Sequence, residues 1–501
     1  MNKLYTILCG VLLLGVISCL KDQGTYGAKQ DINEISISGI DTLYVVDAGK
    51  RTVIRPDVAF SIDETPDTAN YSYKWVAAHM IGLTNAAKTV ATTRDLDTVI
   101  SNLDIGSHFM YYRVTDKRTG LFQDKYFTLT LGSPDYEGWL TYCDTEDGKS
   151  RLDIISRRGP IDTLYRDVLS VVGSAFKTDG KPGFMTTNVN VMGIASGELA
   201  VIIGTENKAA VLGRNSLQYL PANDLDKFFN VTVPITSYAG ASFARKQEGG
   251  VLHLNGKHYL FGRRTITGPF NRTVVGGPLF KASPFVAQNV TASAAGMIVF
   301  DEDSKTFFRY ANGATCLALP KGSLFDYNIK MDLLWMEYVP YESGQVFAVL
   351  KDATTKKVHL ARFTLAGAQV SFDEITAPDI ANAEHFAIHP ESGYIIYNVG
   401  SKIYEYDFTN KKNLLMADYH NRPITILKFH PFNYTTITRT INKPFYESLA
   451  KKLVVCTWDG QDAKTSGILD LYTVPDINAR FIKYKSYPGT GKVAFVGYRE
   501  R

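Results

Sequence analysis

The feature that most constrains the fold is a repeated pattern of short apolar runs and turns that fills residues 138–498. The clearest copy, residues 385–408, has the sequence HFAIHPESGYIIYNVGSKIYEYDF, in which three apolar runs are joined by turns containing Pro, Gly and Ser. Such runs are typical of β-strands joined by tight turns. Weaker copies recur every few dozen residues, at 138–169, 191–220, 250–263, 296–319, 344–365 and 452–474. A strand-built repeat of about 40–50 residues predicts a β-propeller.

We therefore expect residues 134–501 to form a β-propeller-like domain of about seven or eight blades. The run GKVAFVGY at residues 491–498 is expected to close the ring, because an open ring of sheets would leave two strand edges unpaired. A stacked sandwich or a jelly roll is the alternative architecture, because the copies share the spacing of apolar runs and turns but not the residues at matching positions. Helix is expected only as a single turn at residues 224–229.

Residues 32–133 contain several short β-runs in about a hundred residues, the size of an immunoglobulin-like β-sandwich. The run YSYKW places Trp75 in the expected core, and residues 111–131 are expected to form the last hairpin, with its turn near residues 117–120. The Lys-Trp strand end and the run Tyr-Arg-Val-Thr-Asp resemble the PKD-like module of Bacteroidota surface lipoproteins, which usually spaces and presents the domain after it. The predicted fold class is thus all-β, with an Ig- or PKD-like β-sandwich before the propeller.

Residues 1–18 have the order of a signal peptide, with a lysine before an apolar run that is too short to remain as a membrane span. The run ends in Val-Ile-Ser-Cys, which resembles the bacterial lipobox, so Cys19 is expected to be lipidated and to become the new N-terminus. Lys21 and Asp22 resemble the export signal of lipoproteins sent to the outer face of the outer membrane. Residues 19–31 are expected to form a flexible tether, so that the lipid alone holds the chain at the membrane. The alternative is an ordinary cleaved signal peptide.

Charge and cysteine content exclude two classes of protein. The formal net charge of +4 comes from lysines and arginines spread along the chain, so no basic stripe indicates nucleic-acid binding. Beyond the signal region, the widely separated Cys143, Cys316 and Cys456 do not form a disulfide framework, and we expect three buried thiols. The 29 Tyr and 27 Phe suit strands, as well as surfaces that bind by stacking and hydrogen bonding.

The sequence contains no P-loop, no GxGxxG, no GxSxG and no HExxH motif, so no catalytic residue or cofactor is predicted. The best metal candidates are His253 and His258, which flank an Asn-Gly turn and are expected to pair directly across a hairpin. A metal site needs a third ligand, and none is apparent nearby. A polar cross-strand pair is therefore the preferred interpretation.

Two connections are too long for the turns of a propeller blade, and long loops are where binding residues gather. Each places arginine beside aromatic rings, which suits carboxylates and the faces of peptides or sugars. The alternative is an ordinary charged surface loop. The candidate ligand-binding residues are Arg263, Arg264, Phe270 and Arg272 in the first loop, and Tyr434, Arg439 and Tyr446 in the second.

The lipobox, the export-like residues, the PKD-like module and the large β-domain together resemble PKD-like accessory lipoproteins encoded beside SusC/SusD-type importers. This resemblance implies that the importer and neighbouring surface lipoproteins are the partners, and that the cargo is an oligopeptide or a glycan. Peptide is preferred, because arginine-rich aromatic loops suit charged chain ends and exposed tryptophans are few. The alternatives are a surface glycosidase or lyase with its acids in a propeller channel, and a structural scaffold of the importer complex.

Overall fold

A computed structural model describes residues 32–500, except 48–49, 64, 79–86, 104–105, 133–136, 158–161, 192–198, 215, 231–234, 236, 247–248, 263–264, 291–295, 312 and 433–442. The chain separates into two compact units, which are described in turn. The first comprises most of the residues up to Leu129. The second comprises Thr130–Arg501 and the short segments Val45–Lys50 and Leu103–Ser107.

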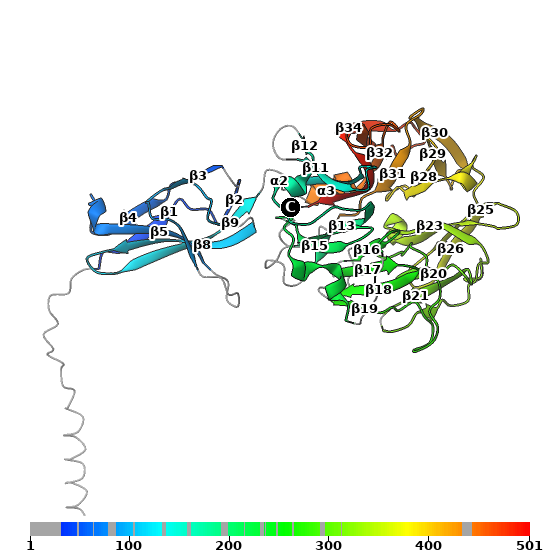
Figure 1. The fold of residues 1–501 in the computed structure, drawn as a ribbon, viewed down its shortest axis with the longest axis horizontal. Helices are drawn as coiled ribbons and strands as arrows, with labels where there is room; N and C mark the ends of the chain where they lie inside the picture. The colour runs from blue at the N-terminus through cyan, green and yellow to red at the C-terminus, as the bar shows by residue number, and fades with distance from the viewer. Residues whose placement is uncertain are drawn as a thin grey trace, which may run out of the picture. The chain divides into compact units, whose positions relative to one another are not determined.

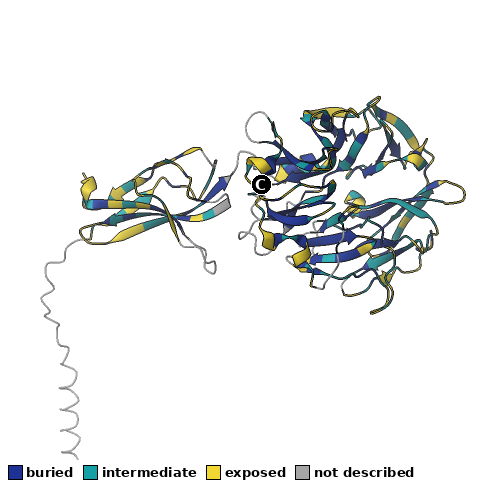
Figure 2. Cartoon of the chain, viewed as in Figure 1, coloured by how far each residue is buried: buried dark blue, intermediate teal, exposed yellow. Residues whose placement is uncertain are grey.

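The N-terminal unit is built from antiparallel strands whose side chains alternate between a buried and an exposed face (Figures 1 and 2). Trp75, Tyr112 and Leu129 on three adjacent strands are fully buried, so the predicted core position of Trp75 is confirmed. The predicted hairpin is also confirmed. One sheet has the order β2 (Leu43–Asp47), β9 (Phe122–Gly132), β8 (Gly106–Asp116), β5 (Tyr71–Ala78) and β6 (Lys88–Ala91), and two smaller pairs are β1 (Ile35–Ser38) with β4 (Asp57–Phe60) and β3 (Arg51–Ile54) with β7 (Leu96–Val99).

The C-terminal unit contains seven antiparallel sheets within the described residues, arranged around a ring (Figure 1). The first strands of several neighbouring sheets contact one another, as β13 does β35 and β16, and β31 does β27 and β35. This is a seven-bladed β-propeller, as the repeat predicted. In the order in which the strands pair, the first sheet is β35 (Lys492–Arg499), β10 (Gly138–Asp144), β11 (Ser150–Ser156) and β12 (Thr163–Tyr165), and the second is β13 (Pro182–Asn190), β14 (Leu199–Thr205) and β15 (Ala209–Gly213). The third is β16 (Ser242–Lys246), β17 (Gly249–Leu254), β18 (Lys257–Gly262) and β19 (Thr265–Thr267), and the fourth is β20 (Met297–Asp301), β21 (Thr306–Tyr310) and β22 (Leu317–Ala318), with the segment 282–287 bridged to the free edge of β20. The fifth is β23 (Asp332–Val339), β24 (Gln345–Lys351), β25 (Val358–Phe363) and β26 (Gln369–Glu374), the sixth is β27 (His385–Ile388), β28 (Ile395–Val399), β29 (Lys402–Asp407) and β30 (Lys412–Asp418), and the seventh is β31 (Ile424–Phe429), β32 (Lys452–Thr457), β33 (Gly467–Thr473) and β34 (Ile482–Thr490).

The last strand closes the ring. Strand β35 pairs with β10 of the first sheet, with Gly138 opposite Arg499 and Asp144 opposite Lys492. The run at residues 491–498 therefore has the role predicted for it. A closed ring of this kind also rules out the stacked sandwich and the jelly roll as the architecture of this unit.

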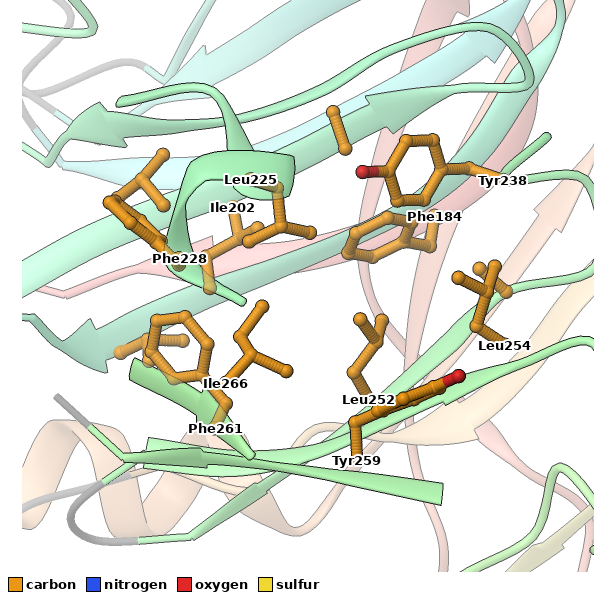
Figure 3. Packing of buried hydrophobic residues seen from close by; sticks show 14 of the residues in the cluster. Phe184, Ile202, Leu225, Phe228, Tyr238, Leu252, Leu254, Tyr259, Phe261 and Ile266 are labelled. Atoms are coloured by element: carbon orange, nitrogen blue, oxygen red, sulfur yellow. The ribbon is translucent and has the colours of Figure 1, made fainter. Parts of the chain in front are cut away.

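Apolar side chains fill the spaces between neighbouring sheets. Figure 3 shows one such cluster, in which Phe184 and Ile202 of the second sheet face Leu252 and Phe261 of the third. All seven residues of β14 are buried, because both faces of a middle strand are covered by other sheets. Each fully buried Leu, Ile or Phe contributes about 1.5–3 kcal/mol. The long apolar runs in the sequence are thus explained by two-sided burial.

Helices are short. The expected turn is present as η3 (Leu225–Phe228), but α3 (Lys443–Ala450) was not predicted. The remaining helical segments are α2 (Val168–Val171), η1 (Thr68–Asn70), η2 (Pro221–Asn223), η4 (Tyr341–Ser343) and η5 (Ile380–Asn382). In the described part of the chain, no helix has the length and hydropathy of a membrane span.

The three cysteines of the propeller are free and buried, as predicted. Burial raises the pKa of the Cys316 thiol to about 12, and it also raises the pKa values of the Cys143 and Cys456 thiols. All three are therefore protonated and unreactive at neutral pH.

Candidate functional site

A cavity of about 310 Å³ lies between the outer strands of the third and fourth sheets, and we call it the loop cavity. Its walls are formed by Leu260 on β18, by parts of the loop 267–276, and by Tyr310 with the turn after it. Phe270 and Arg272, two of the predicted binding residues, both line it. The first long loop identified in the sequence therefore borders a real cavity.

The loop is held in place by a buried asparagine and a buried aromatic ring. The Asn271 side chain accepts a hydrogen bond from the His258 backbone N–H (3.1 Å) and donates to the carbonyl oxygens of Gly256 (3.3 Å) and Phe280. The Phe270 ring packs on Tyr310 with 4.2 Å between ring centroids. Because these anchors order the loop without a ligand, the cavity is preformed.

Phe270 lines the loop cavity but presents little surface to it. Its side chain is only 3% exposed and belongs to the core between the third and fourth sheets. It packs on Tyr310, a second lining residue that is 4% exposed and was not singled out in the sequence analysis. Tyr310 lies in the unremarkable strand TFFRY, and nothing in that run indicates a binding residue.

Arg272 provides the cation of the loop cavity. It is partly exposed, and one Nη atom donates to the carbonyl oxygen of Pro269 (3.2 Å). Its Nε is buried and makes no hydrogen bond within the described residues. A guanidinium group whose hydrogen bonding is incomplete beside an apolar wall suits a ligand that carries a carboxylate and a short apolar group.

The two histidines pair as predicted, with His253 directly opposite His258 and 5.5 Å between ring centroids. The Nε2 atom of His253 lies 3.1 Å from the carbonyl oxygen of Ala282, and that of His258 lies 2.8 Å from the carbonyl oxygen of Ser283. Burial lowers the pKa of His258 to about 3, so its ring is neutral. Among the described residues no three metal-ligating side chains gather. The pair fastens the segment 282–283 to the third sheet.

The second predicted loop is only partly described. Tyr434 and Arg439 lie outside the described residues, as do Arg263, Arg264 and the N-terminal Cys19, Lys21 and Asp22. Tyr446 is not a loop residue. It lies in α3 with its side chain fully buried, and its hydroxyl donates to Glu137 Oε1 (3.1 Å). The sequence analysis placed Tyr446 in the second long loop and missed this helix, although a proline such as Pro444 is common at the start of a helix.

An exposed aromatic strip lies on the outer face of the β8–β9 hairpin in the N-terminal unit. Phe109, Phe122 and Tyr126 are 42%, 54% and 53% exposed. The rings of Phe109 and Tyr126 stack at 5.5 Å, and the guanidinium of Arg113 lies 3.9 Å from the centroid of Phe122. Arg113 is held by two hydrogen bonds to Asp124 of 2.8 and 2.7 Å. These residues form an ordered, exposed aromatic patch, which is the kind of surface that often binds a partner.

Comparison with known proteins identifies one family. Residues 19–182, about a third of the chain, match the PKD-like family. No curated protein matches the sequence significantly. Similar solved structures include a quinonprotein alcohol dehydrogenase-like protein from Bacteroides thetaiotaomicron, at 12% identity and a TM-score of 0.39 over 93% of this chain and 99% of that chain.

Two further similar structures have the same low level of similarity. The extracellular domain of a protein assigned to a one component system of B. thetaiotaomicron has 7% identity and a TM-score of 0.36 over 91% of this chain and 69% of that one. The WD40 domain of SCAP from fission yeast has 9% identity and a TM-score of 0.33 over 55% of this chain and 60% of that one. The propeller assignment rests on the strand pairing of this chain itself.

Proposed function

We propose that the protein is a lipid-anchored lipoprotein of the outer cell surface that binds an oligopeptide for a SusC/SusD-type importer. The observation that carries the proposal is the loop cavity, where Arg272 stands beside the apolar wall of Leu260 and Tyr310. A guanidinium group next to an apolar surface suits a peptide C-terminus, which presents a carboxylate beside its last side chain.

The size of the loop cavity supports binding of a chain end. At about 310 Å³ it is at the lower limit of small-molecule sites, so it accommodates a terminal residue rather than a whole oligomer. Three of the four tryptophans, Trp75, Trp139 and Trp458, are at most 8% exposed and offer no stacking platform, and the fourth, Trp335, is half-buried, so peptide is favoured over glycan. The aromatic strip of β8–β9 supports a partner protein, since it leaves a second surface free for docking.

The site can be tested by isothermal titration calorimetry on the full chain with a panel of short peptides. Arg272→Met should weaken binding of peptides with a free C-terminus by about 10–100-fold, because it removes the cation and its charge-assisted hydrogen bonds. The same peptides with an amidated C-terminus should bind weakly to both proteins. Arg480→Met is the matched control, since Arg480 is exposed and does not line the loop cavity. Unchanged affinity in Arg272→Met, or binding of oligosaccharides alone, would contradict the proposal.

A further inference from the structure

Three separate sheets each place a charged residue on the strand nearest the axis of the propeller. Arg245, Glu337 and Lys428 lie on β16, β23 and β31, the innermost strands of the third, fifth and seventh sheets. The Arg245 guanidinium donates to the carbonyl oxygen of Pro431 (2.6 Å), just beyond β31. A hydrogen bond from the third sheet to the seventh shows that these strands approach one another across the axis.

Arg245 makes several buried contacts. Besides Pro431, it donates to the carbonyl oxygen of Thr187 (3.3 Å) and lies 3.6 Å from Glu500 Oε1. That same oxygen accepts a hydrogen bond from Asn188 (3.0 Å), and the side chains of Arg245 and Glu500 are 6% and 0% exposed. Arg245 is therefore already paired with a carboxylate of the protein.

Glu337 and Lys428, in contrast, are partly buried and make no side-chain hydrogen bond or ion pair within the described residues. Burial raises the pKa of Glu337 to about 7 and lowers the pKa of Lys428. The positive charge of Lys428 lowers the pKa of Glu337, and the positive charge of Arg245 lowers the pKa of Lys428, so the three groups interact electrostatically. The charged forms of both unpaired groups are therefore poorly solvated where they stand.

Two uncharged side chains near the axis also lack one hydrogen-bond partner each within the described residues. His430 Nε2 accepts a hydrogen bond from the Tyr498 backbone N–H (3.2 Å), so the neutral ring carries its proton on Nδ1, which has no acceptor within the described residues. Gln288 donates through Nε2 to the carbonyl oxygen of Arg245 (2.6 Å), while its Oε1 has no donor in the same part of the chain. A buried polar atom without a partner costs about 1–3 kcal/mol, so a partner is expected for each. Lys428 and His430 thus provide a cation and an N–H donor. Glu337 and Gln288 provide a carboxylate and an amide oxygen that accepts.

We propose that these four groups form a second binding site, for a small zwitterion of the α-amino acid class. Lys428 and the Nδ1–H of His430 bind its carboxylate, and Glu337 and the Oε1 of Gln288 bind its ammonium group. The site is independent of the loop cavity, because it lies on the innermost strands and shares no residue with it.

The test is calorimetric titration of the full chain with free amino acids, beginning with glycine and alanine, and with acetate and methylammonium as half-ligands. We expect a dissociation constant below about 1 mM for at least one amino acid and weaker binding of both half-ligands. Lys428→Met and Glu337→Gln should each weaken binding at least about 10-fold. Lys412→Met and Glu374→Gln, at exposed positions on the outermost strands β30 and β26, should leave it unchanged. Arg272→Met should also leave it unchanged, which separates this site from the peptide site.

A second measurement on the unaltered protein covers the case in which the axial variants fail to fold. The ligand's ammonium group favours the ionised form of Glu337, and its carboxylate favours the charged form of Lys428. Binding at pH 7 should therefore be coupled to proton release at Glu337 and proton uptake at Lys428, and titration in buffers of different ionisation enthalpy detects the net exchange. The other titratable groups at the site are Arg245, Glu500, His430 and the Cys456 thiol, and of these Arg245 stays charged and His430 neutral at this pH. Absence of binding or equal affinity for acetate alone would each overturn the proposal.

Discussion

Tyr498 on the closing strand β35 provides the sharpest test of ring closure. Its side chain is 1% exposed, and its ring contacts Trp139 of the first sheet at 5.0 Å and Phe432, just after β31 of the seventh, at 5.2 Å between centroids. Its hydroxyl donates to Glu137 Oε1 (3.0 Å), which also accepts from Tyr446 and pairs with Arg157. The residue therefore joins the two ends of the ring through packing and through one hydrogen bond.

Two substitutions separate these contributions. Tyr498→Phe removes only the hydrogen bond to a carboxylate that keeps two other partners, so we expect a loss of about 1.5 kcal/mol in the free energy of unfolding. Tyr498→Ala also leaves a cavity, and deleting a buried aromatic ring costs a further 3–5 kcal/mol or so, for a total of about 5 kcal/mol. Because whole domains are stable by only about 5–15 kcal/mol, this variant should unfold at a much lower urea concentration.

The assay is urea unfolding followed by circular dichroism and by tryptophan fluorescence, to which Trp139 contributes from beside the substituted ring. Tyr484→Ala on β34 is the control, since Tyr484 is 43% exposed and should change stability by less than about 1 kcal/mol. If Tyr498→Ala lost no more stability than Tyr484→Ala, the closing strand would not hold the ring together as described.

Two further predictions concern the anchor and a buried acid. Cys19→Ala should abolish labelling by palmitate and release the protein from the outer-membrane fraction, while Cys9→Ala changes neither; retained label in Cys19→Ala would refute lipidation at that residue. Glu405 on β29 is 1% exposed, neither carboxyl oxygen has a partner within the described residues, and burial, with a smaller effect from Asp407, raises its pKa to about 8. An unfolded chain ionises this group near pH 4.3, so the folded state holds the extra proton and stability falls as pH rises from about 5 to about 8, by at most ~1.4 kcal/mol per pH unit. Glu405→Gln should remove that part of the pH dependence in urea titrations, and an unaltered slope would show that Glu405 ionises normally.

Local sequence patterns were enough to predict the strands and the closure of the ring. The run HFAIHPESGYIIYNV gives β27 and β28, because apolar side chains must be buried and the Pro-Glu-Ser-Gly segment can only turn. The closing role of GKVAFVGY could be inferred from the need to pair free edges. Both inferences depend on neighbours in the sequence, or on a rule that applies to every sheet.

The binding residues were harder to predict, because they are brought together only by the tertiary fold. Arg272 could be recognised in its loop, but Tyr310 faces it from the next sheet and has no motif of its own. Glu337 and Lys428 lie in ordinary strands, far apart in the sequence, and both come near the axis only because the sheets form a ring. No pattern within either strand indicates that its charged residue lacks a partner.

The pairing of β35 with β10 also has a consequence for how the protein matures. The two strands are separated by nearly the whole length of the propeller sequence, so the first sheet cannot be completed until the final residues have been synthesised. Contacts of such long range slow folding. Until then the exposed edge of β10 is open to pairing with other chains, which makes the interval before closure the time of greatest aggregation risk.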